Sequence, residues 1–210
     1  MLVCAIIAAA LLGYLLGNGN GALIVSQLLF HEDIRTKGSG NAGLTNFFRI
    51  YGGLSTLLVI AIDLGKTVLA CFAGGLLFRA FGLTGESLWQ LGKMTGGFAC
   101  VVGHSLPIFF GFHGGKGVLC SGALSLCMNP WTFLILFAVF VILFSLTHYV
   151  SLGSVSCGIC YPIVFAFFFP KAWAILAMAF GVTVLVVLLH LPNLRRLFAG
   201  NESRVYLKKR

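Results

Sequence analysis

Long apolar runs, separated by shorter polar stretches, dominate the chain. A membrane-spanning helix needs about 20 predominantly apolar residues, and seven candidate segments approach or exceed that length, except one that is expected to be a half-helix. The pattern therefore predicts an all-α integral membrane protein with about seven transmembrane helices, some short or broken. The segments are Leu2–Leu29, Tyr51–Phe81, Met94–Phe110, Val118–Met128 (the half-helix), Trp131–Tyr149, Val155–Phe169 and Ala172–His190.

Composition supports the membrane assignment. The chain is 59% hydrophobic and only 9% charged, with a mean hydropathy of +1.02, whereas soluble domains carry about 25% charged residues. Such a chain has too little polar surface to cover a water-exposed globule, and residues 1–210 are expected to form a single membrane domain. The first seventeen residues lack a basic start, so they are expected to form a membrane segment rather than a cleaved signal.

Basic residues predict the orientation. Fourteen Lys and Arg residues oppose five acidic ones, and basic loops favour the cytoplasmic side. With the N-terminus outside and the C-terminus cytoplasmic, ten basic residues lie inside and three lie at outer edges. The charge suits anionic lipid or anionic substrates, and nucleic acid is not an expected partner because no soluble basic domain is present. The inner residues are Arg35, Lys37, Arg49, Lys116, Arg195, Arg196, Arg204, Lys208, Lys209 and Arg210, and the outer ones are Arg79, Lys93 and Lys171.

The first inner loop is rich in glycine. Glycines let backbone amides turn toward an anion, and an arginine adds a fork suited to phosphate. The loop also fits the G-x-G-x-x-G pattern, but a dinucleotide fold requires a preceding strand, and an apolar helix precedes it here. An ordinary flexible loop is the alternative. The candidate residues are Gly38, Ser39, Gly40, Asn41, Gly43, Thr45, Asn46 and Arg49.

A second inner loop places Lys116 among three glycines, directly before an apolar helix. Amides at a helix start combine with a lysine to make a ready anion site. The P-loop pattern fails because Gly117 replaces the Ser or Thr that holds magnesium. His104 lies near the membrane boundary, where a lone histidine is more often a structural donor than a catalyst. The loop glycines are Gly114, Gly115 and Gly117.

Other polar residues suggest further candidates. Asp63 and Lys66 lie three apart inside the second apolar segment, and we expect a structural ion pair because charges in a bilayer pair toward the protein interior. Ser151 lies at a turn between two segments, where it caps a helix or lines a site. His190 and Asn193 share one possible helical face, although a basic anchor for anionic lipid is the alternative for this tail. The seven cysteines predict neither a disulfide nor a zinc site.

Together the three inner segments resemble the bacterial acyl-phosphate–glycerol-3-phosphate acyltransferases, membrane enzymes that make lysophosphatidic acid. The family's Ser-Gly-Asn-x-Gly-Ala-Thr-Asn loop matches Ser39–Asn46, with Leu44 replacing alanine. Its Gly-His-x-Phe-Pro and Gly-Gly-Lys-Gly motifs match residues 103–117, with Leu106 replacing phenylalanine. Its His-x-x-Asn motif matches His190 and Asn193. The chain departs from the family at Leu119-Cys120, where Ala-Thr is usual, and at Leu191-Pro192.

The resemblance implies transfer of a fatty acyl group from acyl phosphate to glycerol 3-phosphate at the cytoplasmic face of the bacterial inner membrane. The products are 1-acyl-glycerol 3-phosphate and phosphate, and neither a metal nor a cofactor is expected. Ser39, Arg49, Lys116 and Asn193 are expected to hold glycerol 3-phosphate. His104 and His190 are expected to orient the loops or the hydroxyl. The other residues expected to bind substrate are Gly38, Gly40, Asn41, Gly43, Thr45, Asn46, Gly114, Gly115, Gly117, Lys66, Ser151 and Arg196.

Two other functions fit parts of the sequence. Broken helices and intramembrane charges are also features of transporters or channels, here for a phosphorylated small molecule. Against this, no internal repeat is evident and the polar groups gather at one side of the membrane. A transferase that uses a nucleotide-activated donor is the other alternative, but the acidic cluster that magnesium would need is absent from the sequence.

Overall fold

The computed structural model describes residues 1–206 and contains only helices and loops within that range. The chain divides into two compact units, Met1–Met128 and Asn129–Arg210. Lys208, Lys209 and Arg210, predicted to form a basic anchor, lie outside the described residues. The first unit contains α1 (Leu2–Asn18), α2 (Gly21–Phe30), η1 (Ile34–Thr36), α3 (Leu44–Ile50), α4 (Ser55–Ala80), α5 (Glu86–Ser105), η2 (Ile108–Phe110) and α6 (Val118–Met128), and the second contains α7 (Pro130–Thr147), α8 (Val150–Phe168), α9 (Trp173–Leu189) and α10 (Leu191–Phe198).

Four helical stretches are long and apolar enough to cross a membrane, or five if α9 and α10, which are bent by 54°, form one span. Among the described residues, α5 and α6 fall outside this group, so the structure supports fewer spans by length and composition than the seven predicted from sequence. The short helix predicted at Val118–Met128 is confirmed as α6, with the same bounds.

Two predicted segments begin later than the helices that contain them. The third was expected at Met94–Phe110, whereas α5 begins at Glu86 and ends at Ser105. Lys93, which was assigned to an outer edge, is buried inside this helix and donates to the Cys127 carbonyl at 2.6 Å. The sixth was expected from Val155, whereas α8 begins at Val150. In both cases polar side chains lie inside a helix because other groups in the protein satisfy them.

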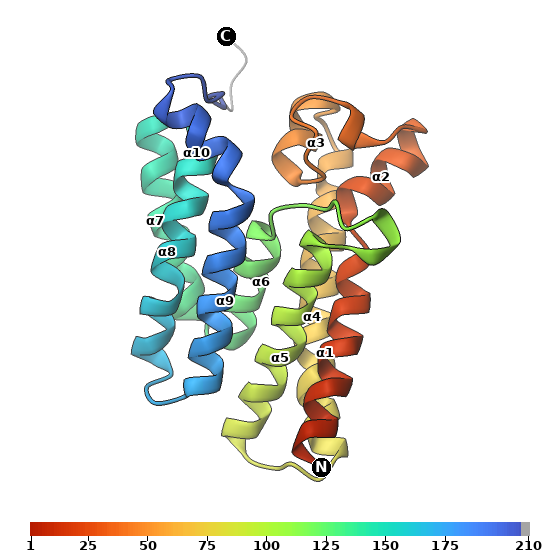
Figure 1. Ribbon diagram of the computed structural model, residues 1–210, viewed down its shortest axis with the longest axis vertical. Helices are drawn as coiled ribbons and strands as arrows, with labels where there is room; N and C mark the ends of the chain where they lie inside the picture. Colours follow the sequence, from red (N-terminus) through yellow and green to blue (C-terminus); the bar gives the residue numbers. More distant parts are fainter. Residues whose placement is uncertain (207–210) are drawn as a thin grey trace. The chain divides into compact units, whose positions relative to one another are not determined.

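Glycines bring three helices of the first unit into backbone contact. In Figure 1, α1, α4 and α5 run alongside one another. A methyl group on Gly13 would overlap the carbonyl of Gly96, and one on Gly103 would overlap the carbonyl of Tyr14. A methyl group on Gly74 would likewise overlap the carbonyl of Gly92. Small residues let membrane helices approach this closely, so this glycine seam fixes the frame that carries the loops.

The first apolar segment is interrupted, which the sequence pattern alone did not resolve. Helix α1 ends at Asn18, and α2 begins at Gly21 after the extended residue Asn20. Beyond α2, an aromatic group anchors the following loop, with Phe30 stacked on Tyr51 at a centroid distance of 3.9 Å. Both glycine loops leave the bundle at the end opposite the N-terminus (Figure 1).

The second unit is a hairpin-like set of apolar helices. Helix α8 packs against both α7 and α9. Asn129 caps α7 by accepting from the amides of Trp131 and Thr132 at 2.8 and 3.4 Å. After α10, the chain turns back so that the Val205 amide donates to the His148 carbonyl at 2.9 Å. The tail is thereby fixed beside the turn between α7 and α8.

Candidate functional site

The first glycine loop is held in shape by an asparagine at its far end. Gly38 and Gly40 adopt φ angles of 59° and 72°, in the left-handed region that favours glycine. The buried Asn46 accepts from the Ser39 amide at 2.9 Å and donates to the Lys37 and Asn41 carbonyls at 3.0 and 3.1 Å. Because these contacts occupy its amide, Asn46 supports the loop, and its role as a direct substrate ligand stays a prediction.

The second loop folds back on the end of α5. The Gly114 and Gly115 amides donate to the Ser105 and His104 carbonyls at 3.2 and 3.1 Å. His104 therefore lies in the last helical turn, and 4% of it is exposed. Gly117 has a φ of 74° and leads directly into α6. The turn leaves Lys116 half-buried in a glycine-rich segment.

The two glycine loops meet. A side chain on Gly115 would overlap Nε2 of His104 and would lie 2.8 Å from the Ala42 carbonyl oxygen. Arg35 joins the loops a second time, because its Nη1 donates to the carbonyls of Phe110 and His113 at 2.7 and 3.3 Å. A 2.7 Å ion pair with Asp33 holds Arg35 in place. The two loops thus contact each other within the first unit.

Acidic groups near these loops are paired. A hydrogen bond from Lys37, helped by one from Tyr51, lowers the pKa of Glu32. A hydrogen bond from Arg35 similarly lowers the pKa of Asp33. Burial and the bond to Glu32 raise the pKa of Tyr51 to about 12. Each carboxylate near the loops therefore stays ionised at neutral pH and has a cation beside it.

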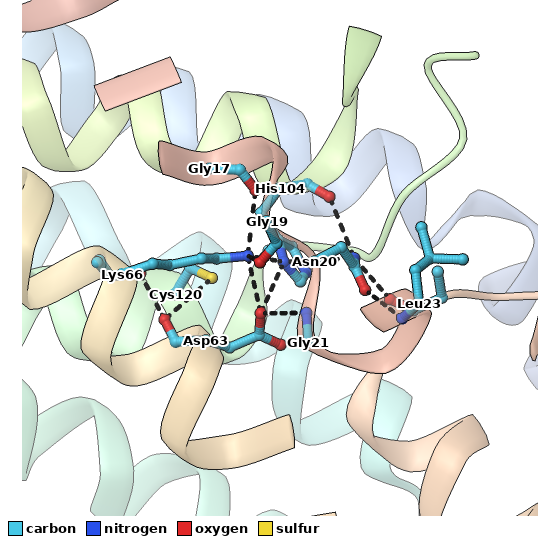
Figure 2. Close-up of polar contacts among 12 residues, drawn as sticks. Gly17, Gly19, Asn20, Gly21, Leu23, Asp63, Lys66, His104 and Cys120 are labelled. Atoms are coloured by element: carbon cyan, nitrogen blue, oxygen red, sulfur yellow. Dashed lines mark hydrogen bonds and ion pairs between the residues drawn. The ribbon is translucent and has the colours of Figure 1, made fainter. Parts of the chain in front are cut away.

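Beneath the loops lies a buried charged cluster formed by Asp63, Lys66 and His104 (Figure 2). The Lys66 ammonium lies 2.8 Å from Oδ1 of Asp63, which confirms the ion pair predicted from sequence. It also lies 2.9 Å from Nδ1 of His104. Since an ammonium only donates, we assign this nitrogen as an acceptor and the imidazole as neutral.

Lys66 also satisfies backbone groups released by the helix break. Its ammonium donates to the carbonyls of Gly17 and Gly19 at 3.1 and 3.0 Å, while Asp63 accepts from the Gly21 amide at 3.0 Å. Protein atoms thus surround the ammonium. Lys66 thus supports the structure beneath the loops, and its binding of substrate stays a prediction.

The same cluster contains a set of possible metal ligands. Asp63, His104 and Cys120 each offer one ligand atom, and these atoms lie within 4.8 Å of one another. Oxygen, nitrogen and sulfur donors together suit zinc. The Lys66 ammonium, however, lies within hydrogen-bonding distance of both the Asp63 and the His104 ligand atoms. The position that a cation would take beside these two residues is therefore already held by lysine.

The remaining first-unit candidates lie on the loops themselves. Ser39 is exposed on the first loop, and its backbone is fixed through the bond to Asn46. Arg49 is exposed in the last turn of α3, and Thr45 is half-buried in that helix. Asn41 and Gly43 form the turn before α3, where the Gly43 amide donates to the Asn41 carbonyl at 2.9 Å.

The second unit holds the other predicted residues around one carboxylate. Glu202 accepts from Asn193 at 2.6 Å and from Arg196 at 2.8 Å. Burial raises the pKa of Glu202, but the hydrogen bonds from Asn193 and Arg196 outweigh it and leave the pKa below its usual range. His190 is buried at the end of α9, and Ser151 is buried in the first turn of α8. The fixed carboxylate thus orders the tail residues around α10.

Comparison with known proteins decides the family. A sequence model described as Glycerol-3-phosphate acyltransferase matches residues 7–200. The chain belongs to the glycerol-3-phosphate acyltransferase family. The acyltransferase of Finegoldia magna is 35% identical over 192 residues, which cover 91% of this chain and 92% of its own. That of Staphylococcus saprophyticus is 35% identical over 201 residues, covering 95% and 98%.

Solved structures agree with this membership in the acyltransferase family. The crystal structure of PlsY (YgiH), an integral membrane glycerol 3-phosphate acyltransferase, matches in its glycerol 3-phosphate form with a TM-score of 0.82 and 30% identity, covering 96% of both chains. Its lysophosphatidic acid form matches with a TM-score of 0.79 and 29% identity. The chain is accordingly an integral membrane acyltransferase with several apolar helices.

Sequence reasoning missed three residues that shape the acyltransferase loops. Arg35 was counted only as an inner charge, yet it joins the two loops. Asn20 was assigned no role, yet it is fully buried beneath both loops. Glu202 was also assigned no role, yet it accepts from Asn193 and Arg196. A buried polar residue inside an apolar run was the available signal for Asn20.

Proposed function

We propose that this acyltransferase moves a fatty acyl group from acyl phosphate to glycerol 3-phosphate. The observation that carries the proposal is the junction of the two glycine loops at Gly115, Ala42 and His104. Both substrates carry phosphate, and two contacting glycine loops with Lys116 suit two such groups held side by side. The names of the family relatives and of the solved neighbours support glycerol 3-phosphate as acceptor.

The reaction needs positioning more than activation, because an acyl phosphate is already an activated anhydride. The acceptor hydroxyl oxygen attacks the acyl carbon, and the bond from that carbon to the phosphate oxygen then breaks. Holding the reactants in place supplies about 7–11 kcal/mol, and each donor aimed at the developing oxyanion about 3–4 kcal/mol. The products are 1-acyl-glycerol 3-phosphate and inorganic phosphate.

The substrate itself accepts the proton in this proposal. A phosphate oxygen takes the hydroxyl proton, since the nearby Glu32 and Asp33 carboxylates are engaged by Lys37 and Arg35. His104 is buried, with Nδ1 against Lys66 and Nε2 against Gly115, which supports a structural role rather than general-base catalysis. A His104→Ala variant that lost the basic limb of its pH–rate profile, with substrate affinity intact, would point back to histidine.

We assign glycerol 3-phosphate to Ser39, Arg49, Lys116 and Asn193. We assign the acyl phosphate to Thr45, Asn46 and the amides around Gly40, Gly43, Gly114, Gly115 and Gly117. The cytoplasmic side of a bacterial inner membrane, with the N-terminus outside, is the proposed setting because basic residues concentrate in the loops assigned to that side. Residues 1–210 are proposed to act as a single transmembrane acyltransferase domain.

Purified protein tests this function directly. Incubation with acyl phosphate and glycerol 3-phosphate should yield 1-acyl-glycerol 3-phosphate, whereas acyl thioester donors should give none. Lys116→Ala should lower turnover by about a hundredfold or more while the protein stays folded. Lys171→Gln, at an exposed lysine outside both loops, is the matched control and should retain full activity. Near-normal turnover in Lys116→Ala would overturn the site assignment.

A further inference from the structure

At the break between α1 and α2, buried side chains hydrogen-bond to the backbone groups that the break frees. In a bilayer, backbone groups freed by a break need partners inside the protein. Lys66 serves the Gly17 and Gly19 carbonyls, and Asp63 serves the Gly21 amide. Asn20, between these glycines, is extended with φ −71° and ψ 116°, so its side chain leaves the helix axis at this point. The Asp63–Lys66 ion pair thus stabilises the helix break at which Asn20 lies.

The Asn20 side chain makes contacts of two kinds. Its Oδ1 accepts from the Leu23 amide at 3.1 Å, which caps α2. Its Nδ2 donates to the Ala42 carbonyl at 3.0 Å and lies 3.5 Å from both the carbonyl and Nδ1 of His104 (Figure 2). The cap is local, whereas the amide group reaches elements 22 and 84 residues away.

The Ala42 and His104 carbonyls, which are these distant partners, both lie against Gly115. The His104 carbonyl accepts from the Gly115 amide at 3.1 Å, and the Ala42 carbonyl lies against the position that a Gly115 side chain would fill. Asn20 therefore lies under a point where the first glycine loop meets the second. It has no exposed surface of its own.

We propose that Asn20 is a positioning residue for the acyl transfer: its amide group sets the spacing between the two glycine loops and thereby between the two phosphate-bearing reactants. The proposal rests on the proposed function for its kinetic consequence. Its structural content, that one amide holds two loops in register, does not depend on the identity of the substrates. Small displacements of positioned reactants cost large factors in rate.

Serine separates the two roles of this side chain. Ser is as good a helix cap as Asn, but it carries no amide group to reach Ala42. Asn20→Ser therefore keeps the cap and removes the link. Asn129→Ser is the matched control, because Asn129 caps α7 by accepting from the amides of Trp131 and Thr132. Asn20→Asp is the second variant, since it keeps the shape and the cap but turns an acceptor toward the Ala42 carbonyl.

The kinetic experiment measures kcat and both KM values, with the folded fraction of each variant determined by size-exclusion chromatography. Asn20→Ser should lower kcat at least tenfold and raise KM for one or both substrates at least threefold. Its thermal midpoint should equal that of Asn129→Ser. Asn20→Asp should lose at least as much. Kinetic constants equal to those of Asn129→Ser would overturn the proposal. A fall in rate that is proportional to the fall in folded fraction, with unchanged KM values, would also overturn it.

Hydrogen exchange supplies a readout independent of turnover. Peptides covering residues 37–46 and 111–117 should exchange faster in Asn20→Ser than in the wild type, and Asn129→Ser should leave them unchanged. Unaltered exchange in both loops would overturn the positioning role. A wild-type protein that transfers no acyl group would instead overturn the proposed function, and the exchange result would still decide the role of Asn20.

Discussion

Two lysine–carboxylate pairs in the first unit have similar lengths but opposite surroundings. Lys66 and Asp63 lie 2.8 Å apart with 7% and 2% of their side chains exposed. Lys37 and Glu32 lie 2.6 Å apart, each 39% exposed. Water competes for the second pair and screens it, whereas nothing replaces a lost partner in the first. The distance between the charges therefore does not rank the contributions of these pairs to stability, whereas the burial of each pair does.

The largest effect is expected from breaking the interior pair. Lys66→Met leaves the Asp63 carboxylate buried without its cation and leaves the Gly17 and Gly19 carbonyls without a donor. Removing one partner of a buried pair costs about 3–5 kcal/mol. Thermal unfolding in detergent, followed by circular dichroism, should show a correspondingly lower midpoint. The double variant Asp63→Leu with Lys66→Met should recover part of the loss, and a fully stable single variant would contradict this account.

A smaller effect is expected at the intermediate pair of the second unit. Arg196 is 43% exposed while Glu202 is 7% exposed, at 2.8 Å. Glu202→Gln keeps a hydrogen-bonding shape but removes the charge that holds Arg196 and Asn193. We expect a loss of about 1 kcal/mol, because solvent reaches the arginine. Denaturant titration measures this, and a loss as large as that of Lys66→Met would refute the ranking by enclosure.

Acid should affect the same carboxylate over a defined range. The folded-state pKa of Glu202 lies below its ordinary value of 4.5. The stabilisation is therefore complete above pH 4.5 and is lost as the pH falls from there through the lowered pKa. Unfolding midpoints measured from pH 6 down to about pH 3 should fall less steeply in Glu202→Gln than in the wild type. Parallel curves would show that this group does not contribute.

The smallest effect is expected at the exposed pair. Lys37→Gln removes a contact that solvent already weakens, so the expected loss of stability is smaller than that of Glu202→Gln. The same loss should shrink further in high salt, because exposed charges are screened. Unfolding midpoints of the wild type and of Lys37→Gln at low and high salt make the test. A salt-independent loss of several kcal/mol would mean that the pair is enclosed in solution.

The sequence predicted what depends on local pattern. Apolar length located the helices to within several residues, and the spacing of Asp63 and Lys66 predicted their ion pair, because residues three apart share a helix face. Glycine content located both loops. The helix break at Asn20 and the joining of the loops by Arg35 were not predictable, since each depends on contacts with residues distant in the chain.

Two of the predicted site residues make extensive contacts within the protein. Lys66 and Asn46 look like ligands because both carry donors near polar motifs. Burial and hydrogen bonding show that these donors serve carbonyls of the protein itself, and the amides of Gly114 and Gly115 likewise donate to protein carbonyls. A linear sequence reports which donors are present but not which of them the protein itself engages after folding.

The glycine seam between α1, α4 and α5 limits where the hydrocarbon tail of a lipid-like reactant can lie. Where Gly13 faces Gly96 and Gly103 faces Tyr14, even one added methyl group would collide with main chain. A hydrocarbon chain is as wide as a methyl group along its whole length, so it has no passage through the middle of these three helices. Any such tail must therefore run outside the middle of this trio.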